Sequence, residues 1–221
     1  MINKVVETGL AAMSAIGDGA RVMIGGFGES GLPEYLIDAL IERGSRDLTV
    51  ISNNAGVGMT GIAKLLASGL VGRLICTYPR SVGAVVVADL YQKGLLELEV
   101  VPQGTFSERI RAAGAGIGGF YVKTGVGTKA VQGKEVRTIG GQDYVFETPL
   151  HADFALIKAD RGDRWGNLTY HAGGRCYGPV MAPAARHTVA EVREVVDLGA
   201  LNPEEIVTPG IFVKGVVRRP A

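Results

Sequence analysis

The segment VMIGGFGESGLPEYL, Val22–Leu36, contains a glycine-rich turn whose backbone can bind negative charge. Val22–Ile24 is an apolar run typical of a buried strand, and Pro33 fits the first position of a helix. Exposed N–H groups between a strand and a helix, together with the helix dipole, favour an anion or a polarised carbonyl. We therefore predict a binding site formed by Gly25, Gly26, Phe27, Gly28, Glu29, Ser30 and Gly31. The alternative is a tight turn that needs glycine for positive φ and holds no ligand.

Gly26–Gly31 also matches the G-x-G-x-x-G spacing of dinucleotide-binding folds, but two confirming features of that fingerprint are absent. The third glycine of the fingerprint lies within the first turn of the helix, whereas Pro33 places the helix start after Gly31. The acid about 20 residues further on should end the second strand. Asp47 instead begins that strand, so the spacing alone does not indicate NAD binding.

Amide side chains follow two of the predicted strands, at the edge where ligands bind in open α/β sheets. Asn53 and Asn54 end the second strand, and Gln103 and Gly104 follow the fourth. We predict that these four residues bind substrate, and that Gln103 can donate a hydrogen bond to a developing oxyanion. The alternatives are that the asparagines cap a turn and that the glutamine caps a helix.

These candidate residues require strands and helices that alternate along the first half of the chain. Apolar runs predict strands at residues 21–27, 47–52, 73–78 and 97–102. Apolar periodicity predicts helices at residues 4–16, 33–43, 61–69, 82–94 and 105–116. Alternation with short connections predicts an α/β fold, a mostly parallel open sheet with helices on both faces.

The second half of the chain adds an antiparallel element. KEVRTIGGQDYVFETPL, residues 134–150, predicts a small β-hairpin excursion with Gly140-Gly141 at the turn. Further strands are predicted at residues 153–159, 188–199 and 211–219. Because no Ser/Pro-rich linker and no internal repeat interrupts the chain, we expect a single domain over residues 1–221.

Composition argues against several classes of partner and site. The chain has 47% hydrophobic and 20% charged residues and a net charge of +1, without a basic or acidic run. Neither nucleic acid nor a membrane surface is therefore expected as a partner. Cys76 and Cys176 lie far apart, and the three histidines share no ligand spacing, so neither a disulfide framework nor a metal site is expected. The N-terminal segment has no continuous apolar stretch, so we expect no signal peptide and a cytoplasmic location.

The order of residues around the glycine turn resembles the first signature of family I coenzyme A transferases. The pattern is Asp18-Gly19, two residues, Val22-Met23-Ile24, Gly25-Gly26-Phe27, three residues, and Gly31-Leu32-Pro33. Four further segments resemble the alpha subunit in the same order: ISNNAGVG, VPQGTFSERIRAAGAGIGGFYVKTGVGT, ADRGDRWGNLTY and NPEEIVTPGIFVKGVV. The resemblance covers nearly the whole chain, and it implies the fold shared by these transferases and the NagB-like proteins.

The resemblance implies transfer of coenzyme A from an acyl-CoA, usually succinyl-CoA, to a free acid by a ping-pong route. In this family a Glu of the beta subunit attacks the thioester and becomes a glutamyl-CoA. That Glu lies in a Ser-Glu-Asn-Gly type motif, which does not occur in this chain. No catalytic nucleophile is thus expected in this chain, and Glu29 is interpreted as a loop carboxylate. We expect a beta-subunit partner, in a heterodimer or an α2β2 heterotetramer. No permanently bound cofactor is expected. The coenzyme A thioester is expected to bind as a substrate at Gly25–Gly31.

PLHADFALIKADRGDRWGNLTY is more similar to the members that act on 3-oxoadipate in aromatic catabolism than to acetoacetate enzymes, which remain the alternative. Arg80 and Arg109 are candidates for the extra carboxylate of that acceptor. The chain departs from the family at residues 171–176, where Arg175 remains but an earlier basic pair is missing. Two other hypotheses are a sugar-phosphate isomerase of related architecture and a non-enzymatic effector-binding module. The strand ends carry amides rather than acid/base carboxylates, and no output domain is present, so both are less favoured.

Overall fold

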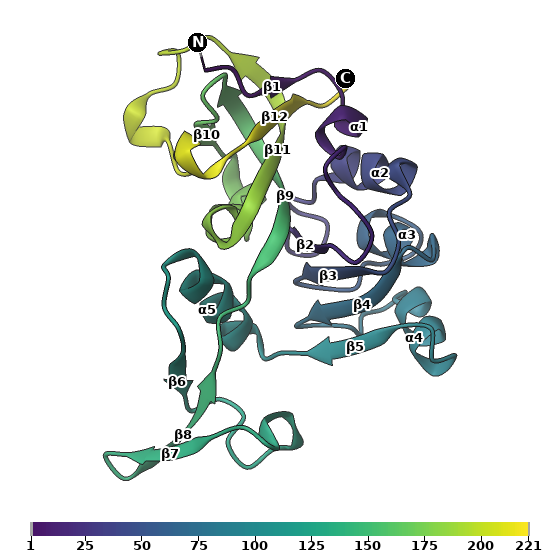
Figure 1. Cartoon of the computed structure of the whole chain (residues 1–221), viewed down its shortest axis with the longest axis vertical. Helices are drawn as coiled ribbons and strands as arrows, with labels where there is room; N and C mark the ends of the chain where they lie inside the picture. The colour runs from purple at the N-terminus through teal and green to yellow at the C-terminus, as the bar shows by residue number, and fades with distance from the viewer. Residues whose placement is uncertain (1, 221) are drawn as a thin grey trace.

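The computed structural model describes residues 2–220, and its centre is a twisted, mostly parallel sheet (Figure 1). Within these residues the sheet runs in the order β1 (Val5–Val6), β12 (Gly215–Arg218), β11 (Ala185–Val196), β9 (Ala152–Asp163), β2 (Arg21–Ile24), β3 (Leu48–Ser52), β4 (Val71–Cys76) and β5 (Glu97–Val100). Among the strands of this sheet that residues 2–220 form, only β10 (Leu168–Thr169) pairs antiparallel, with β9. This confirms the predicted mostly parallel open sheet.

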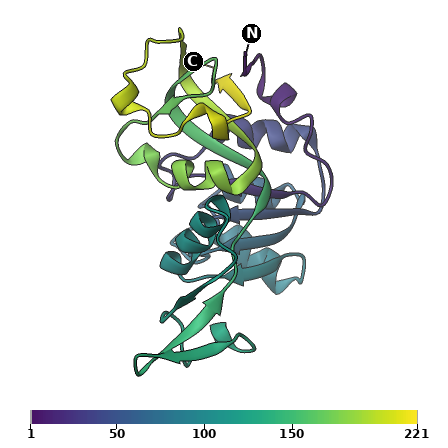
Figure 2. The same ribbon diagram turned by 60° about the vertical axis from the view of Figure 1, so that its left-hand side comes forward.

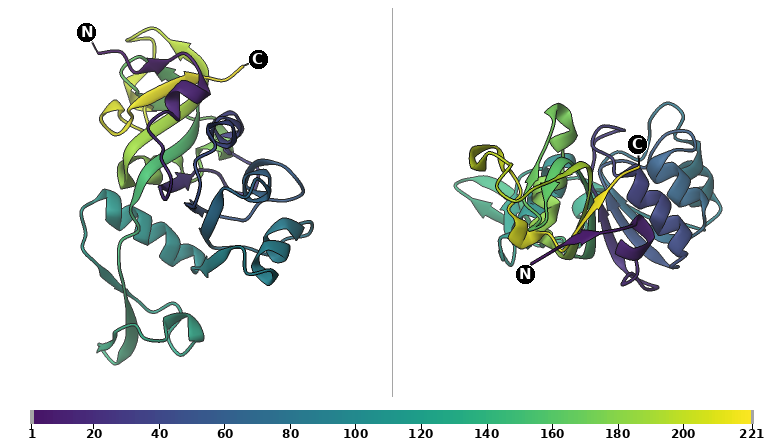
Figure 3. Two further views of the ribbon diagram at one scale, coloured as in Figure 1. Left: turned by 45° about the vertical axis from the view of Figure 1, so that its right-hand side comes forward. Right: turned by 90° about the horizontal axis from the view of Figure 1, so that it is seen from above.

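Helices cover both faces of the sheet, as predicted (Figures 1 and 3). They are α1 (Gly9–Ala12), α2 (Glu34–Arg43), α3 (Gly61–Ala67), α4 (Val85–Gln92), α5 (Gln103–Gly114) and α6 (Gly178–Met181). On β2, Val22 and Ile24 belong to the core that includes α2 and α3, whereas Met23 belongs to the core with α5 and α6. Successive strand residues point to opposite faces, so both faces are buried and the strand is apolar throughout.

The predicted helix over residues 4–16 is wrong at its start. Val5 and Val6 form strand β1, which pairs in parallel with Val216 and Val217 of β12. Only Gly9–Ala12 is helical. Pairing with the distant C-terminal strand overrides the local helical pattern, and β-branched residues suit this strand.

The predicted hairpin is confirmed and belongs to an arm that projects from the main sheet (Figure 2). Strands β7 (Val136–Ile139) and β8 (Gln142–Glu147) meet at Gly140-Gly141, where both φ angles are positive, as the tight turn requires. A short strand that the sequence did not predict, β6 (Phe120–Val122), completes a three-stranded sheet. The single domain over residues 1–221 stays a prediction.

Arg109 of α5 joins this arm to the body of the protein. Its guanidinium contacts Glu99 at 3.1 Å and Glu147 at 3.8 Å, and it donates to the Thr148 carbonyl at 2.9 Å. Its role in the structure is therefore to anchor the arm. Among the described helices, none is both long enough and apolar enough to cross a bilayer.

Candidate functional site

The glycine turn after β2 consists of a buried base and an exposed tip. Gly25, Gly26 and Gly31 are buried, whereas Phe27–Ser30 is exposed. Phe27 and Ser30 exchange backbone hydrogen bonds of 2.9 and 3.1 Å, which closes a two-residue hairpin. Of its two central residues only Gly28 has positive φ, at 61°, which fits a type II′ turn.

The buried glycines satisfy the packing of the protein itself. A Cβ at Gly31, which has φ of 71°, would lie 2.5 Å from the carbonyl oxygen of Gly174. A Cβ at Gly26, with φ of 111°, would lie 3.1 Å from the Cα of Leu32. These two glycines are therefore needed for backbone geometry and close packing, which supports that part of the alternative interpretation.

At the tip, the N–H groups of Gly28 and Glu29 donate no hydrogen bond within residues 2–220. The tip faces a cavity of about 400 Å³, which we name the amide cavity. Its wall is formed by Phe27, Gly28, Glu29, Leu32, Asn53, Asn54, Gly56, Val57, Thr60, Ile62, Tyr78, Ser81 and Gln103. The cavity thus brings together six of the predicted site residues. Outside its wall are Gly25, Gly26, Ser30, Gly31 and Gly104.

The two asparagines of this cavity are already held by the protein. Asn53, buried at the end of β3, donates to the Thr77 hydroxyl at 3.0 Å and to the Tyr177 hydroxyl at 3.5 Å. Asn54 accepts from the Gly56 N–H at 2.7 Å and donates to the Gly28 carbonyl at 3.4 Å. Asn54 therefore ties the end of β3 to the tip of the glycine turn.

Gln103 differs from the asparagines because its amide is free to meet a ligand. It is the first residue of α5, and its exposed side chain makes no hydrogen bond within the described residues. Glu29 is the one charged residue in the wall, and neither lysine nor arginine is part of it. The wall offers amide and backbone N–H donors on an apolar background, which suits an uncharged reacting group better than a multiply charged anion.

The candidates for an acceptor carboxylate lie elsewhere. Arg109 is occupied by the arm contacts described above, and Arg80 lines a different depression, beside Tyr91 and Val100. Cys76 of β4 is fully buried, and burial raises the pKa of its thiol to about 12.

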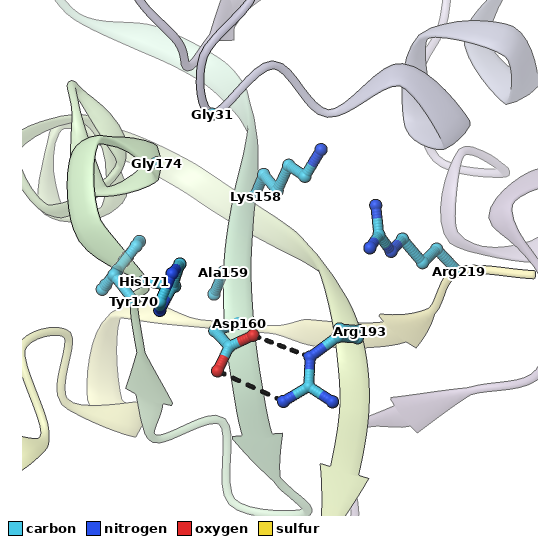
Figure 4. A pocket seen from close by; sticks show the side chains of 9 residues that line it. All are labelled: Gly31, Lys158, Ala159, Asp160, Tyr170, His171, Gly174, Arg193 and Arg219. Carbon is cyan, nitrogen blue, oxygen red and sulfur yellow. Dashed lines mark hydrogen bonds and ion pairs between the residues drawn. The ribbon is translucent and has the colours of Figure 1, made fainter. Parts of the chain in front are cut away.

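A second cavity, of about 470 Å³, has the opposite character, and we name it the cationic cavity (Figure 4). Its wall is formed by Gly31, Lys158, Ala159, Asp160, Tyr170, His171, Gly174, Arg193 and Arg219. Gly31 belongs to the same turn whose tip lines the amide cavity. The sequence patterns singled out none of its lysine or arginine residues, because they are spread over β9, β11 and the segment after β12.

A buried carboxylate lies beside the cationic cavity. Glu191 of β11 is 1% exposed; its Oε2 accepts from the Leu36 N–H of α2 at 3.2 Å, and its Oε1 lies 3.9 Å from the Lys158 Nζ. Burial raises its pKa to about 7, against the opposing effects of the Leu36 N–H and Lys158.

Glu191 occupies the start of α2, where the sequence predicted that the helix dipole would help to bind a ligand anion. The prediction of an anion over Gly25–Gly31 stays a prediction, but it now depends on the tip N–H groups rather than on the α2 dipole. A signal was present in the sequence, because Glu191 interrupts the apolar run from Val189 to Val192. A charge inside a strand buried on both faces requires a partner.

Known proteins are similar in sequence to this chain over nearly its whole length. Residues 6–219 match the family described as coenzyme A transferase. The sequence is 56% identical to the A subunit of 3-oxoadipate CoA-transferase of Pseudomonas putida, over 98% of this chain and 94% of that protein. It is 44% identical to the A subunit of the probable succinyl-CoA:3-ketoacid coenzyme A transferase of Bacillus subtilis, over 98% and 90%.

Solved structures show the same fold. An acyl-CoA transferase from Escherichia coli O157:H7, in a thioester complex with CoA, superposes with a TM-score of 0.85 at 22% identity. The match covers 99% of this chain, which spans 48% of that one. Glutaconate coenzyme A-transferase from Acidaminococcus fermentans gives a TM-score of 0.84 at 20% identity, over 98% of this chain and 76% of that one.

Proposed function

This chain belongs to the coenzyme A transferase family, and we propose that it is the alpha subunit of an enzyme that moves coenzyme A from succinyl-CoA to 3-oxoadipate. Two relatives more than half identical over 98% of the chain are named as the A subunit of 3-oxoadipate CoA-transferase, which supports this acceptor. Relatives named for 3-ketoacids are less similar, and acetoacetate is the alternative acceptor. We propose the cytoplasm as its location, because coenzyme A thioesters are made and used inside cells.

The observation that carries the half-enzyme proposal is the open, apolar surround of the amide cavity. Phe27, Val57 and Tyr78 line the cavity and are 50%, 40% and 60% exposed, and Met59, near Val57 in sequence, is 62% exposed. Large apolar side chains gathered at a cavity mouth are typical of a surface that another chain covers. We propose that the beta subunit covers this surface and brings the nucleophilic Glu, in a heterodimer or an α2β2 heterotetramer.

The chemistry proposed for the complete enzyme conserves the energy of the thioester. A carboxylate oxygen of the beta-subunit Glu attacks the thioester carbonyl carbon, and the C–S bond breaks to give an acyl anhydride and a thiolate. The thiolate attacks the Glu carbonyl, which forms glutamyl-CoA and releases succinate. The incoming oxoacid then reverses these steps. No proton or electron needs to enter or leave, so a site that excludes water suits the whole exchange.

In each addition step an oxyanion develops on the carbonyl that is attacked. Gln103 and the free N–H groups of Gly28 and Glu29 line one cavity, and we assign them as hydrogen-bond donors to that oxygen. Asn53 and Asn54 hold the surrounding backbone in place through their hydrogen bonds. Because the wall has no lysine or arginine, the second carboxylate of 3-oxoadipate is assigned to groups outside this wall.

The test measures transfer from succinyl-CoA to 3-oxoadipate and to acetoacetate, by the purified chain alone and after mixing with a candidate beta subunit. We expect activity only in the mixture, with 3-oxoadipate the better acceptor by kcat/KM. Full activity in the chain alone would overturn the half-enzyme proposal. A higher kcat/KM for acetoacetate would overturn the choice of acceptor and leave the transferase assignment standing.

A further inference from the structure

The cationic cavity contains two positive side chains that converge on the same space from different strands. Lys158 extends from β9 and Arg219 follows β12, and their charged ends point toward each other across the cavity (Figure 4). A third cation, Arg193, is already matched, since its guanidinium contacts both carboxylate oxygens of Asp160 at 2.8 and 3.4 Å. Lys158 and Arg219 are therefore the two cations of the cavity that lack a close carboxylate partner of this kind.

The protein supplies these two cations with only part of a counter-charge. Lys158 lies 3.9 Å from Glu191, at the outer limit of an ion pair, and the other oxygen of that carboxylate is held by the Leu36 N–H. Arg219 makes no ion pair within 4.0 Å among residues 2–220, although its charge acts at longer range on the same Glu191 carboxylate, so the two cations share one counter-charge. Because the pKa of Glu191 is about 7, its carboxylate is only partly ionised at neutral pH. Two like charges that face each other without a full counter-ion favour an external anion between them.

The other residues of the cavity wall indicate which kind of anion would fit there. His171 adds a potential donor on the side opposite Arg219, while the Tyr170 hydroxyl is engaged with Thr208 at 2.7 Å. Gly31 and Gly174 contribute a wall without side chains. A single carboxylate would balance one of the two cations, whereas a phosphate group carries up to two charges and several acceptor oxygens that both cations can contact.

We propose that the cationic cavity is a binding site for a phosphate group, with Lys158 and Arg219 as its principal donors. Two sources share this chemistry: the phosphates of the coenzyme A substrate, which rests on the proposed function, and a free phosphate-bearing metabolite. The glycine turn lines both cavities, so a substrate bound through its phosphates on one side can present its thioester arm on the other.

Binding is tested first without any reaction, by calorimetric titration of the purified full chain with pyrophosphate. Arg219→Gln is the main variant, because Arg219 is exposed and its replacement should leave the fold intact. Lys158→Gln is the second. Arg186→Gln is the matched control, since this arginine is 88% exposed and lies outside the cavity. We expect each cavity variant to weaken pyrophosphate binding about tenfold, for one lost charge-assisted contact, and the control to leave it unchanged.

The second measurement distinguishes the two sources in the enzyme assembled with its beta subunit. If the site takes the phosphates of coenzyme A, Arg219→Gln raises KM for succinyl-CoA about tenfold and leaves kcat/KM for succinyl-pantetheine, which has no phosphate, unchanged. An unchanged KM for succinyl-CoA with weakened pyrophosphate binding indicates a free phosphate ligand.

Two results would count against the phosphate site, and a third would separate its outcome from that of the proposed function. Absence of pyrophosphate binding to the wild-type chain, together with an unchanged KM in both variants, would overturn the proposal. Equal affinity for succinate would overturn phosphate as the ligand. Pyrophosphate binding that depends on Arg219, in an assembled enzyme inactive with every thioester, would support the anion site and reject the proposed function alone.

Discussion

The two cavities share one glycine turn and differ in almost every other respect. The amide cavity has an apolar wall with uncharged donors and Glu29 as its one charged residue, whereas the cationic cavity is lined by Lys158, Arg193 and Arg219. Acyl exchange between carboxylates and a thioester gains most from donors in surroundings of low dielectric constant. A polyanionic carrier needs positive charge, which would disturb that environment if it were adjacent. The difference indicates that reaction and charge recognition are kept on separate sides of one backbone turn.

The largest predicted effect comes from disturbing the turn that both cavities share. Gly31→Ala places a Cβ 2.5 Å from the Gly174 carbonyl at a φ of 71°. We expect a loss of about 3 kcal/mol or more in the free energy of unfolding. Displacement of the donors should lower kcat of the assembled enzyme about 100-fold. Denaturant unfolding and turnover measure the two effects.

Gly94→Ala is the control, because it has a similar φ of 68° but open space around the new Cβ. It should cost about 1 kcal/mol, for the strained backbone alone. Equal losses in both variants would mean that contact between the turn and Gly174 is unimportant.

Removing the free Gln103 amide should weaken the function of the amide cavity and leave that of the cationic cavity unchanged. Gln103→Ala should lower kcat about 100-fold, the usual loss for one oxyanion donor, with little change in KM for succinyl-CoA. Stability should stay unchanged, because the Gln103 side chain is exposed and makes no hydrogen bond within the described residues. Gln132→Ala is the matched control, because this exposed glutamine of the arm likewise makes no side-chain hydrogen bond within residues 2–220. A loss in Gln103→Ala that appears only in KM would assign Gln103 to binding instead.

Glu191 links the cationic cavity to the start of α2. We predict that its ionisation makes the free energy of unfolding depend on pH. Its pKa is raised from 4.5 to about 7 in the fold. Between these pH values the folded protein keeps a proton that the unfolded chain has released, so stability falls as pH rises through this window. Glu191→Gln should remove that fall and be more stable above pH 7, by at most about 3 kcal/mol at about 1.4 kcal/mol per pH unit. Thermal unfolding from pH 4.5 to 8 measures it.

If the stability of the wild type does not fall between pH 4.5 and about 7 when it is compared with that of Glu191→Gln, the Glu191 carboxylate is ionised in the folded protein. In that case the hydrogen bond from the Leu36 N–H stabilises the ionised carboxylate by more than its burial destabilises it. Lys158→Gln separates the two contributions, because removing this cation should raise the pKa of Glu191 further and extend the fall in stability to higher pH.

The fold was largely predictable because local patterns and tertiary burial agree along the first half of the chain. Strands β2 to β4 are largely apolar, β5 alternates glutamate with apolar residues, and each of the four is followed by a helix. The short connections between them leave few topologies. The failure at residues 4–16 has a physical cause, since Val5 and Val6 pair with a strand about 200 residues away. Strand β6 was missed because three half-buried residues carry no periodic signal.

The site was predictable where it follows strand ends and unpredictable where it depends on side chains from distant strands. Asn53, Asn54 and Gln103 line one cavity with the turn because the carboxyl ends of parallel strands meet at one edge. Lys158 and Arg219 meet only because β9, β11 and β12 are neighbours in the sheet. No spacing in the sequence encodes that order, although Glu191 inside an apolar strand was a sign of a buried charge partner.

The smallest predicted effect concerns Glu29, the one charge in the amide cavity. Its carboxylate sits at the exposed tip of the turn, and removing a negative charge there does not hinder the approach of an anionic thioester. Glu29→Gln in the assembled enzyme should therefore keep kcat within about threefold of wild type. Mass spectrometry after incubation with succinyl-CoA should find the glutamyl-CoA adduct on the beta subunit in both proteins. A loss of about 10³-fold, with the adduct absent from the variant and present on this chain in wild type, would mean that the nucleophile is Glu29. The amide cavity would then be a complete reaction site, and the apolar side chains around its mouth would need another explanation.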